Sequence, residues 1–210
     1  MLLKKGAEAN LYLDEWHGLK VIMKRRLPKA YRLSTLDDAI RIHRTVHEPQ
    51  IIHRAKEAGV PTPTIYLVDI DDANIIMEFI EGKQVKQILN DISQVERTDL
   101  CHRIGILIGR LHNHGIVHGD LTTSNMILTS YGRVFLVDFG LSEQSNEVEA
   151  RGVDLHLMKR ALQSTHYRYA KECLEVVMAS YSEVVGKEAA EDVLKKIQEI
   201  ERRGRYVSER

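Results

Sequence analysis

The chain has 210 residues, with 30 Lys and Arg residues balanced by 30 Asp and Glu residues, and 43% of its residues are hydrophobic. This length suits one domain or one two-lobed unit with an ample core, and the balanced charge indicates no particular class of partner. The opening residues lack a long apolar run, which argues against a signal peptide, a membrane span or a membrane partner, so we expect a soluble, cytoplasmic protein.

The first part of the chain predicts strands around one helix. Strand-like residue patterns recur in four short stretches: residues 10–13, 19–24, 65–68 and 75–79. A helix is expected to begin at Ser34, where Asp37 three residues later completes a capping-box pattern, and to end at Gly59. Pro49 lies within this helix and should kink it or make it restart, because proline removes a backbone donor and clashes with the preceding turn.

The second part of the chain predicts mostly helices. Helical patterns are expected at residues 85–90, 95–114, 149–164, 167–185 and 188–203, with short strands at 126–128 and 134–137. Cys101 and Cys173 lie far apart in these helical patterns and are expected to be buried thiols, neither a disulfide nor a metal site. His112 and His114 could ligate a metal, but no third Cys or carboxylate stands near them. The expected organisation is an α+β fold with a β-rich lobe at residues 1–82 and a helical lobe at residues 83–210.

Two motifs in sequence point to phosphoryl transfer. Residues 117–125 read Val-His-Gly-Asp-Leu-Thr-Thr-Ser-Asn, and Asp138-Phe139-Gly140 follows, each beside a strand-like run. The spacing matches the protein-kinase pattern H-x-D-x-x-x-x-N followed by D-F-G. In this interpretation Asp120 orients the attacking oxygen, whereas Asn125 and Asp138 hold Mg²⁺ against the nucleotide phosphates. The alternative is that these polar residues are ordinary turn-formers, with His118 bracing the loop in either case.

Lys24 is the candidate for the lysine that contacts the nucleotide phosphates. It ends a strand as Val-Ile-Met-Lys, the place of the kinase V-A-I-K lysine. Its carboxylate partner on the following helix is Glu48 or Glu57, and Glu48 is favoured because Glu57 lies in the last helical turn. The alternative is that Lys24 is one more cation in a solvated basic run at residues 24–29.

The segments expected to cover the phosphates and the adenine are less typical. The loop that replaces the glycine-rich loop of kinases contains a single glycine and consists of Gly6, Ala7, Glu8 and Ala9. Close approach of the backbone to phosphate favours residues without Cβ, so this loop departs from the usual pattern. Residues 77–82 resemble a kinase hinge. The candidate adenine contacts are the backbone of Glu78 and Ile80 and the side chains of Ile22 and Ile127.

Three departures from regulated kinases predict an unusual substrate side. Gly119 stands where many regulated kinases carry an arginine that binds a phosphorylated activation loop, and Thr122 stands where they place a phosphate-contacting lysine. Too few residues separate Asp138 from Asp154 for a full activation segment. Asp154 resembles the aspartate that braces the catalytic loop. We therefore expect neither a peptide-docking platform nor a need for activation-loop phosphorylation.

Over essentially its whole length the sequence resembles the small atypical kinase subunit of the KEOPS (EKC) complex of archaea and eukaryotes. The most specific segments are Gly6-Ala7-Glu8-Ala9, the basic residues between Lys24 and Arg32, Arg44-Thr45 leading to Glu48, residues 118–125, residues 138–141 and the arginine-rich end. The compact length resembles the archaeal members. Pro49 departs from the family pattern, in which a small helix former is usual after the glutamate.

This resemblance implies a small bilobal protein-kinase-like fold with a reduced helical lobe. It also implies an ATP- and Mg²⁺-dependent Ser/Thr kinase that autophosphorylates and acts as an ATPase within the complex. The complex supports threonylcarbamoyl modification of the adenosine next to the anticodon of certain tRNAs. The implied partners are the threonylcarbamoyl-transferase subunit on the helical lobe and a small regulatory subunit on the N-terminal lobe. In some archaea the transferase and the kinase are fused.

The end of the chain is a candidate tRNA contact. Arg202, Arg203, Arg205 and Arg210 surround Tyr206, a composition suited to phosphate contacts and base stacking. The alternatives are a solvated tail and a contact with the transferase subunit.

Other functions stay open from the sequence. A small-molecule kinase of the aminoglycoside-phosphotransferase type shares the His-Gly-Asp signature but usually has a larger helical lobe. A RIO-type kinase shares the short segment after D-F-G. A pseudokinase scaffold is disfavoured because Lys24, Asp120, Asn125 and Asp138 are all present.

Overall fold

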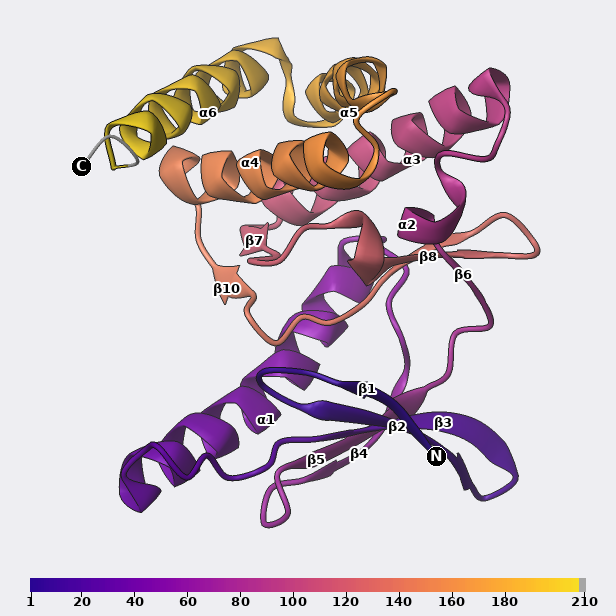
Figure 1. Cartoon of the computed structure of the whole chain (residues 1–210), viewed down its shortest axis with the longest axis vertical. Helices are drawn as coiled ribbons and strands as arrows, with labels where there is room; N and C mark the ends of the chain where they lie inside the picture. Colours follow the sequence, from indigo (N-terminus) through magenta and orange to yellow (C-terminus); the bar gives the residue numbers. More distant parts are fainter. Residues whose placement is uncertain (208–210) are drawn as a thin grey trace.

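A computed structural model of the chain describes residues 1–207. Its N-terminal part is a five-stranded antiparallel sheet with the strand order β1-β2-β3-β5-β4. The strands are β1 (Leu2–Lys5), β2 (Asn10–Trp16), β3 (Leu19–Arg25), β4 (Ile65–Asp69) and β5 (Asn74–Glu78). The long helix α1 (Ser34–Glu57) connects β3 to β4 and rises from the sheet toward the remaining helices (Figure 1).

The rest of the chain forms a helical lobe, drawn in the upper half of Figure 1. Its helices are α2 (Val85–Ile88), α3 (Gln94–Asn113), α4 (Val148–Thr165), α5 (Ala170–Val185) and α6 (Lys187–Val207). Its short elements are β6 (Gly82–Gln84), β7 (Ile116–Val117), the 3-10 turn η1 (Thr123–Asn125), β8 (Met126–Thr129), β9 (Val134–Leu136) and β10 (Glu143–Gln144). Strands β6, β8 and β9 form a three-stranded sheet, and β10 pairs with β7. The predicted α+β arrangement, with an N-terminal sheet and a helical C-terminal lobe, is confirmed.

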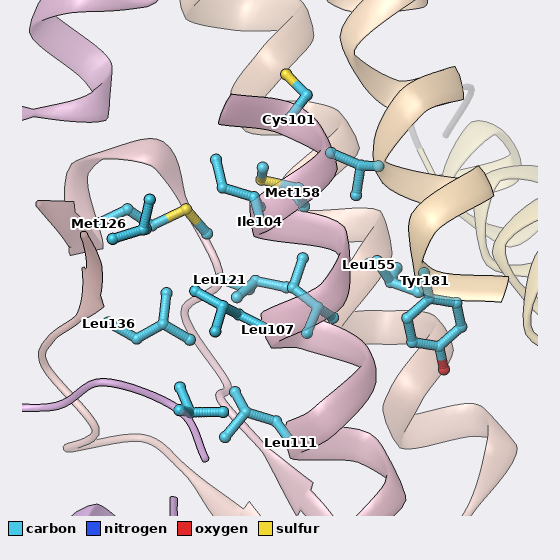
Figure 2. Packing of buried hydrophobic residues seen from close by; sticks show 14 of the residues in the cluster. Cys101, Ile104, Leu107, Leu111, Leu121, Met126, Leu136, Leu155, Met158 and Tyr181 are labelled. Atoms are coloured by element: carbon cyan, nitrogen blue, oxygen red, sulfur yellow. The ribbon is translucent and has the colours of Figure 1, made fainter. Parts of the chain in front are cut away.

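Helix α3 is the centre of the C-terminal core because its apolar residues recur at helical spacing. Ile104, Leu107 and Leu111 face Met126 and Leu136 of the small sheet (Figure 2). Except for Leu107, which is 7% exposed, these side chains are 0% exposed. Burial of each such side chain contributes about 1.5–3 kcal/mol relative to an exposed one. The core therefore fixes the positions of β8, which follows the predicted catalytic loop, and of β9, which precedes Asp138.

The capping box predicted for α1 is wrong. Ser34 is the first helical residue, and the residue before the helix, Leu33, offers no side-chain cap. The buried Asp37 carboxylate instead accepts a hydrogen bond from Nε of Arg41 at 3.0 Å. An ionised donor forms a stronger hydrogen bond with a carboxylate than a neutral group does, so the arginine outcompetes the cap.

Pro49 does not make α1 restart. The α-helix is continuous from Ser34 to Glu57. Ile51 and Ile52, which follow Pro49, are no more than 2% exposed and belong to the main hydrophobic core. Their burial stabilises the helical turn that the missing backbone donor weakens.

Several short strands were absent from the sequence prediction. Strand β6 begins at Gly82, at the end of the predicted hinge, and β10 lies between the strand predicted at 134–137 and the helix predicted at 149–164. Strand β10 pairs with β7, so that Glu143 lies opposite Val117. Pairs this short and this distant in sequence leave no alternating pattern, because their partner determines them.

The two cysteines are buried free thiols, as predicted. Although they are distant in sequence, Cys173 on α5 lies close enough to Cys101 on α3 to affect the pKa of its thiol. This proximity and burial raise the pKa of the Cys101 thiol, which therefore stays protonated. Across residues 1–207, no helix is long and apolar enough to span a membrane.

Candidate active site

The predicted catalytic loop lies between β7 and β8, and a side-chain amide fixes its carboxylate. Nδ2 of Asn125 donates hydrogen bonds to the backbone carbonyl of Asp120 at 2.9 Å and to Oδ2 of the same residue at 2.8 Å. Both amide hydrogens of the buried Asn125 side chain are thus committed to Asp120. The remaining Oδ1 is an acceptor oxygen beside the Asp120 carboxylate, and its role as a ligand of Mg²⁺ stays a prediction.

Asp154 on α4 braces this loop from the helical lobe. Its side chain is 0% exposed, and its two oxygens accept the backbone N–H groups of His118 at 2.7 Å and Gly119 at 2.9 Å. Nε2 of His112 lies 3.3 Å from the same carboxylate, and Nδ1 of His112 lies 3.0 Å from the hydroxyl of Tyr181. The resemblance of Asp154 to a loop-bracing aspartate is therefore confirmed by its hydrogen bonds.

His118 is a structural residue. Its Nδ1 accepts the backbone N–H of Asp120 at 3.3 Å, which leaves Nε2 to donate to the carbonyl of Val137 at 3.2 Å. Since both ring nitrogens are used and the side chain is fully buried, His118 has no nitrogen free to serve as a base. It connects the catalytic loop to the strand end that carries Asp138.

Asp138 follows β9 in an unusual backbone conformation. Its φ is 65°, in the left-handed region that non-glycine residues seldom adopt. The 37% exposed carboxylate lies 2.5 Å from Nζ of Lys24. Burial raises the pKa of the Asp138 carboxyl, but the Lys24 ammonium outweighs burial and holds that pKa below its usual value. Asp138 is therefore ionised at neutral pH.

Lys24 on β3 pairs with Glu48, not with Glu57. Nζ of Lys24 lies 2.7 Å from Oε1 of Glu48, whose side chain is 1% exposed, whereas Glu57 is exposed and lies 3.5 Å from His53. Burial lowers the pKa of the Lys24 ammonium, but the carboxylates of Glu48 and Asp138 outweigh burial and hold the pKa above its ordinary value. The pairing forms despite the adjacent Pro49.

Arg26 is a second buried cation on Glu48 and corrects the view of residues 24–29 as solvated. Its side chain is 2% exposed, forms an ion pair with Oε2 of Glu48 and donates from Nη1 to the hydroxyl of Thr45 at 3.3 Å. Lys24 is likewise buried. Both oxygens of Glu48 are therefore bound by cations, Lys24 of β3 and Arg26 just after it, which hold α1 against β3.

Lys24, Arg26, Asp120 and Asp138 converge on a cavity of about 230 Å³, whereas the predicted site residues Glu48 and Asn125 do not line it. It is lined by Lys4, Gly6, Ala7, Glu8, Ala9, Leu11, Lys24, Arg26, Arg44, Asp120, Asp138, Gly140 and Leu141. The loop between β1 and β2 covers the cavity, and its Gly6 N–H donates to the Ala9 carbonyl at 3.1 Å. A Cβ at Gly6 would lie 2.6 Å from that carbonyl oxygen, so this tight turn requires glycine. The predicted phosphate loop thus lies over the predicted catalytic and metal-binding carboxylates.

The predicted adenine contacts do not line this cavity. Glu78 pairs with Val21 at the end of β5. Ile80 is buried, and its backbone N–H has no hydrogen-bond acceptor among residues 1–207. Ile22 and Ile127 are half-buried. The structure gathers the phosphate end of the predicted site into one cavity, whereas the adenine end stays a prediction.

A larger hollow of about 890 Å³ lies beside the catalytic loop. Residues 122–124 line it together with parts of α4 and α6, and it contains none of the predicted catalytic or metal-binding residues. Thr122, which stands where many kinases have a lysine, lies at its edge, with its hydroxyl 3.0 Å from that of Ser124.

The segment after Asp138 is short and lies directly against the catalytic loop. Gly119 has a φ of 77°, and a Cβ there would lie 2.2 Å from the carbonyl oxygen of Leu141. The hydroxyl of Ser142 donates to the carbonyl of His118 at 2.8 Å, and β10 follows at once. An arginine at position 119 would collide with this path.

The two remaining predicted sites are the histidine pair His112 and His114 and the basic end of the chain. His114 is bound to the carbonyl of Arg110, away from His112, and residues 1–207 contain no group of three or more His, Cys, Asp or Glu side chains that could hold a metal. Helix α6 extends to Val207, four residues beyond its predicted end, and Arg203 pairs with Glu149 of α4 at 2.8 Å. Residues 208–210, with the predicted contact Arg210, lie outside the described part.

Sequence reasoning missed two arginines that line the cavity. Arg26 follows Lys24 by two residues, the spacing that places side chains on one face of an extended chain. Arg44 precedes Glu48 by four residues and therefore lies on the same face of α1. These two spacings are the sequence signals that could have placed Arg26 and Arg44 beside Lys24 and Glu48.

Known proteins are similar to this chain in sequence and in fold. A family model described as protein kinase domain matches residues 13–186. The KEOPS complex subunit Bud32 of Pyrococcus abyssi is 46% identical over 211 residues, which cover 98% of this chain and 96% of that protein. The chain belongs to the Bud32 family of protein kinases. The EKC/KEOPS complex subunit bud32 of Dictyostelium discoideum is 37% identical and covers 98% of this chain, which in turn covers 82% of that protein.

Another relative is much longer than this chain. The probable bifunctional tRNA threonylcarbamoyladenosine biosynthesis protein of Methanothermobacter thermautotrophicus is 45% identical over 98% of this chain but only 36% of that protein. The chain thus spans about a third of that relative. A solved Rio2 kinase-ADP/Mg²⁺-phosphoaspartate complex from Chaetomium thermophilum has a TM-score of 0.65 at 16% identity, over 93% of this chain and 69% of that one. At this identity the likeness shows only that this chain shares the fold of that kinase.

Proposed function

We propose that this chain is an Mg·ATP-dependent Ser/Thr kinase and ATPase that acts as the kinase subunit of a KEOPS complex and supports threonylcarbamoyl modification of tRNA. The observation that carries the proposal is the convergence of Lys24, Asp120 and Asp138 on one cavity. The KEOPS setting is supported by the similarity to Bud32 of Pyrococcus abyssi over nearly the full length of both chains. A cytoplasmic location, where ATP and tRNA are available, is part of this proposal.

In the proposed reaction, Asp120 orients a hydroxyl group or a water molecule toward the terminal phosphorus of ATP. The new O–P bond forms as the bond to the β-phosphate oxygen breaks, and its electron pair leaves on ADP. The proton of the attacking oxygen passes to the Asp120 carboxylate. Lys24, held by Glu48, orients the phosphates, and the backbone of Gly6 to Ala9 covers them. Adenine would contact the backbone of Glu78 and Ile80, between Ile22 and Ile127.

The residues present fit Mg²⁺, which prefers oxygen ligands. Asp138 presents a carboxylate to the cavity, and Asn125 retains Oδ1 because its two amide hydrogens are bound to Asp120. Mg²⁺ held there would offset the charge on the phosphates. Nucleotide oxygens and water would complete the ligand set, since these two side chains alone are too few.

The proposed partners are the threonylcarbamoyl-transferase subunit on the helical lobe, the small regulatory subunit on the N-terminal lobe, and tRNA. The bifunctional name of the Methanothermobacter relative, about a third of which this chain matches, supports a transferase partner. The proposed tRNA contact is the basic end that contains Arg202, Arg203, Arg205 and Arg210. Because Arg203 already pairs with Glu149, phosphate would have to compete for that guanidinium.

ATP turnover with and without the transferase subunit and tRNA tests this function. We expect turnover that rises with both partners. Asp138→Ala should reduce turnover by roughly 1,000-fold without unfolding the chain, because this carboxylate lies at the cavity and not in the core. Asp120→Asn should lower kcat by about 100-fold or more with little change in ATP affinity, because Asp120 acts in the transition state. Normal turnover in folded Asp138→Ala protein would contradict the assignment.

A further inference from the structure

The phosphate end of the site lacks one cation that kinases of the usual pattern supply. Position 122 holds a threonine whose hydroxyl lies 3.0 Å from that of Ser124, so the catalytic loop offers no charge there. The ammonium of Lys24 is already bound by Glu48 and Asp138. A triphosphate carries several negative charges, so a further cation at the cavity would add to the stabilisation that Mg²⁺ and Lys24 give the terminal phosphate.

Arg44 on α1 is placed to supply this charge. It lies one helical turn before Glu48 and lines the same cavity as Asp120 and Asp138. Its side chain, 28% exposed, forms an ion pair with Glu8 of the loop that covers the cavity. Among the described residues, Glu8 is the only hydrogen-bond partner of the Arg44 guanidinium. A guanidinium has five N–H donors, so Arg44 can bind a further anion.

The carboxylate of Glu8 binds the Arg44 guanidinium, as the oxygens of a phosphate group would. This carboxylate is 42% exposed and is also approached by Arg32 at 3.9 Å, from outside the cavity lining. Lys4 also lines the cavity, but its ammonium is a point charge on an exposed strand. The planar fork of an arginine matches two phosphate oxygens at once, which favours Arg44 over Lys4.

We propose that Arg44 binds the terminal phosphate of Mg·ATP, replacing its bond to Glu8 with bonds to phosphate oxygens, and so supplies the charge that Thr122 does not. This inference rests on the proposed function. Arg44 transfers no proton, because its guanidinium stays charged throughout, and it stabilises the negative charge on the transferred phosphoryl group. ADP lacks that phosphate, so Arg44 should favour ATP over ADP.

The test compares ATP and ADP affinities, by calorimetry with Mg²⁺, and kcat for a set of variants. Arg44→Ala should lower the ATP-to-ADP affinity ratio and kcat by roughly 10- to 100-fold, as expected for loss of a charge-assisted hydrogen bond. Affinity for ADP should change little, which also shows that the variant is folded. Arg44→Lys should retain part of the ratio. The matched control is Arg32→Ala, which removes the other cation near Glu8 and should leave the ratio unchanged.

Repeating the Arg44→Ala substitution in a Glu8→Gln protein distinguishes two roles of Arg44: binding phosphate, and holding the loop between β1 and β2 through Glu8. If Arg44 binds phosphate, Arg44→Ala still lowers the ATP-to-ADP ratio in that background. If Arg44 acts only by holding Glu8, the effect disappears there, and this result would overturn the inference. Equal ratios in the wild-type and Arg44→Ala proteins would overturn it too. Failure of the proposed function is a distinct result, since the wild-type chain would then bind neither nucleotide.

Discussion

On the N-terminal side of the cavity, Lys24 meets carboxylates from two other elements, Glu48 on α1 and Asp138 after β9. On the C-terminal side, Asp154 instead meets the backbone N–H groups of the loop that carries Asp120. Charges that bridge separate elements can be redistributed when phosphate and Mg²⁺ arrive, whereas backbone hydrogen bonds to a buried carboxylate fix one loop conformation. We therefore expect the N-terminal half of the site to rearrange when nucleotide binds and the C-terminal half to be organised in advance.

Glu48→Gln should have the largest effect on stability. The substitution leaves Lys24 and Arg26 facing a neutral amide, and removal of one partner from a buried ion pair costs about 3–5 kcal/mol. Chemical denaturation measures the free energy of unfolding. Glu57→Gln is the matched control on the same helix, and its exposed contact with His53 should contribute nothing measurable. Equal costs for the two variants would mean that the buried charges do not hold α1 in place.

Asp154→Asn makes the same carboxylate-to-amide change on the other side and should cost less stability. The amide retains one accepting oxygen, so about one buried N–H is left unpaired, at roughly 1–3 kcal/mol. Turnover should fall by about 10-fold or more while ATP affinity is retained, because only the loop that carries Asp120 is disturbed. Equal losses of affinity and turnover would show that the two halves of the site are not separate.

The Lys24–Asp138 contact predicts a stability that changes at the two ends of the pH range. The folded pKa of Asp138 lies below its ordinary value of 3.8, so its contribution is present above pH 3.8 and is lost as the pH falls below that value. The folded pKa of Lys24 lies above 10.5, so its contribution is present below pH 10.5 and is lost as the pH rises further. Unfolding measured between neutral and acid pH should show a shallower acid dependence for Asp138→Asn than for the wild type. Identical acid limbs would contradict this contact.

Phosphatase treatment should have the smallest effect, namely none on turnover. The segment after Asp138 is held by the hydroxyl of Ser142 on the His118 carbonyl and by the pairing of β10 with β7, neither of which involves a phosphate. Phosphorylation at Ser142 would break the first contact. Loss of turnover on phosphatase treatment, with recovery on rephosphorylation of Ser142 or Ser145, would contradict the view that the segment is assembled without modification.

Local patterns made part of this site predictable. The residues Asp120, Asn125 and Asp138 stand at fixed spacings beside strand ends, so the motif alone placed them close together, and the structure brings them there. The choice of Glu48 over Glu57 came from distance to the end of the helix. These are relations within one or two neighbouring elements, which periodicity and turn chemistry report directly.

The remaining parts depend on contacts between distant elements. Arg25 is exposed and Arg26 is buried, yet both belong to one basic run. The two-residue spacing puts Arg26 on the same face as Lys24, but only the position of Glu48 on α1 makes that face the buried one. The pairing of Glu8 with Arg44 and of β10 with β7 joins residues 36 and about 27 positions apart. The capping box failed for a local reason, since Arg41, four residues further along the same helix, gives Asp37 a charge-assisted hydrogen bond in place of the cap.

The contact between Gly119 and Leu141 also limits how this enzyme could be redesigned. A side chain at position 119 and the present course of residues 139–144 exclude one another, because the first atom of that side chain would overlap the Leu141 carbonyl. Grafting a phosphate-controlled switch onto the chain therefore cannot start from a single arginine. It would require replacement of the whole connection between Asp138 and α4, and loss of β10 with it.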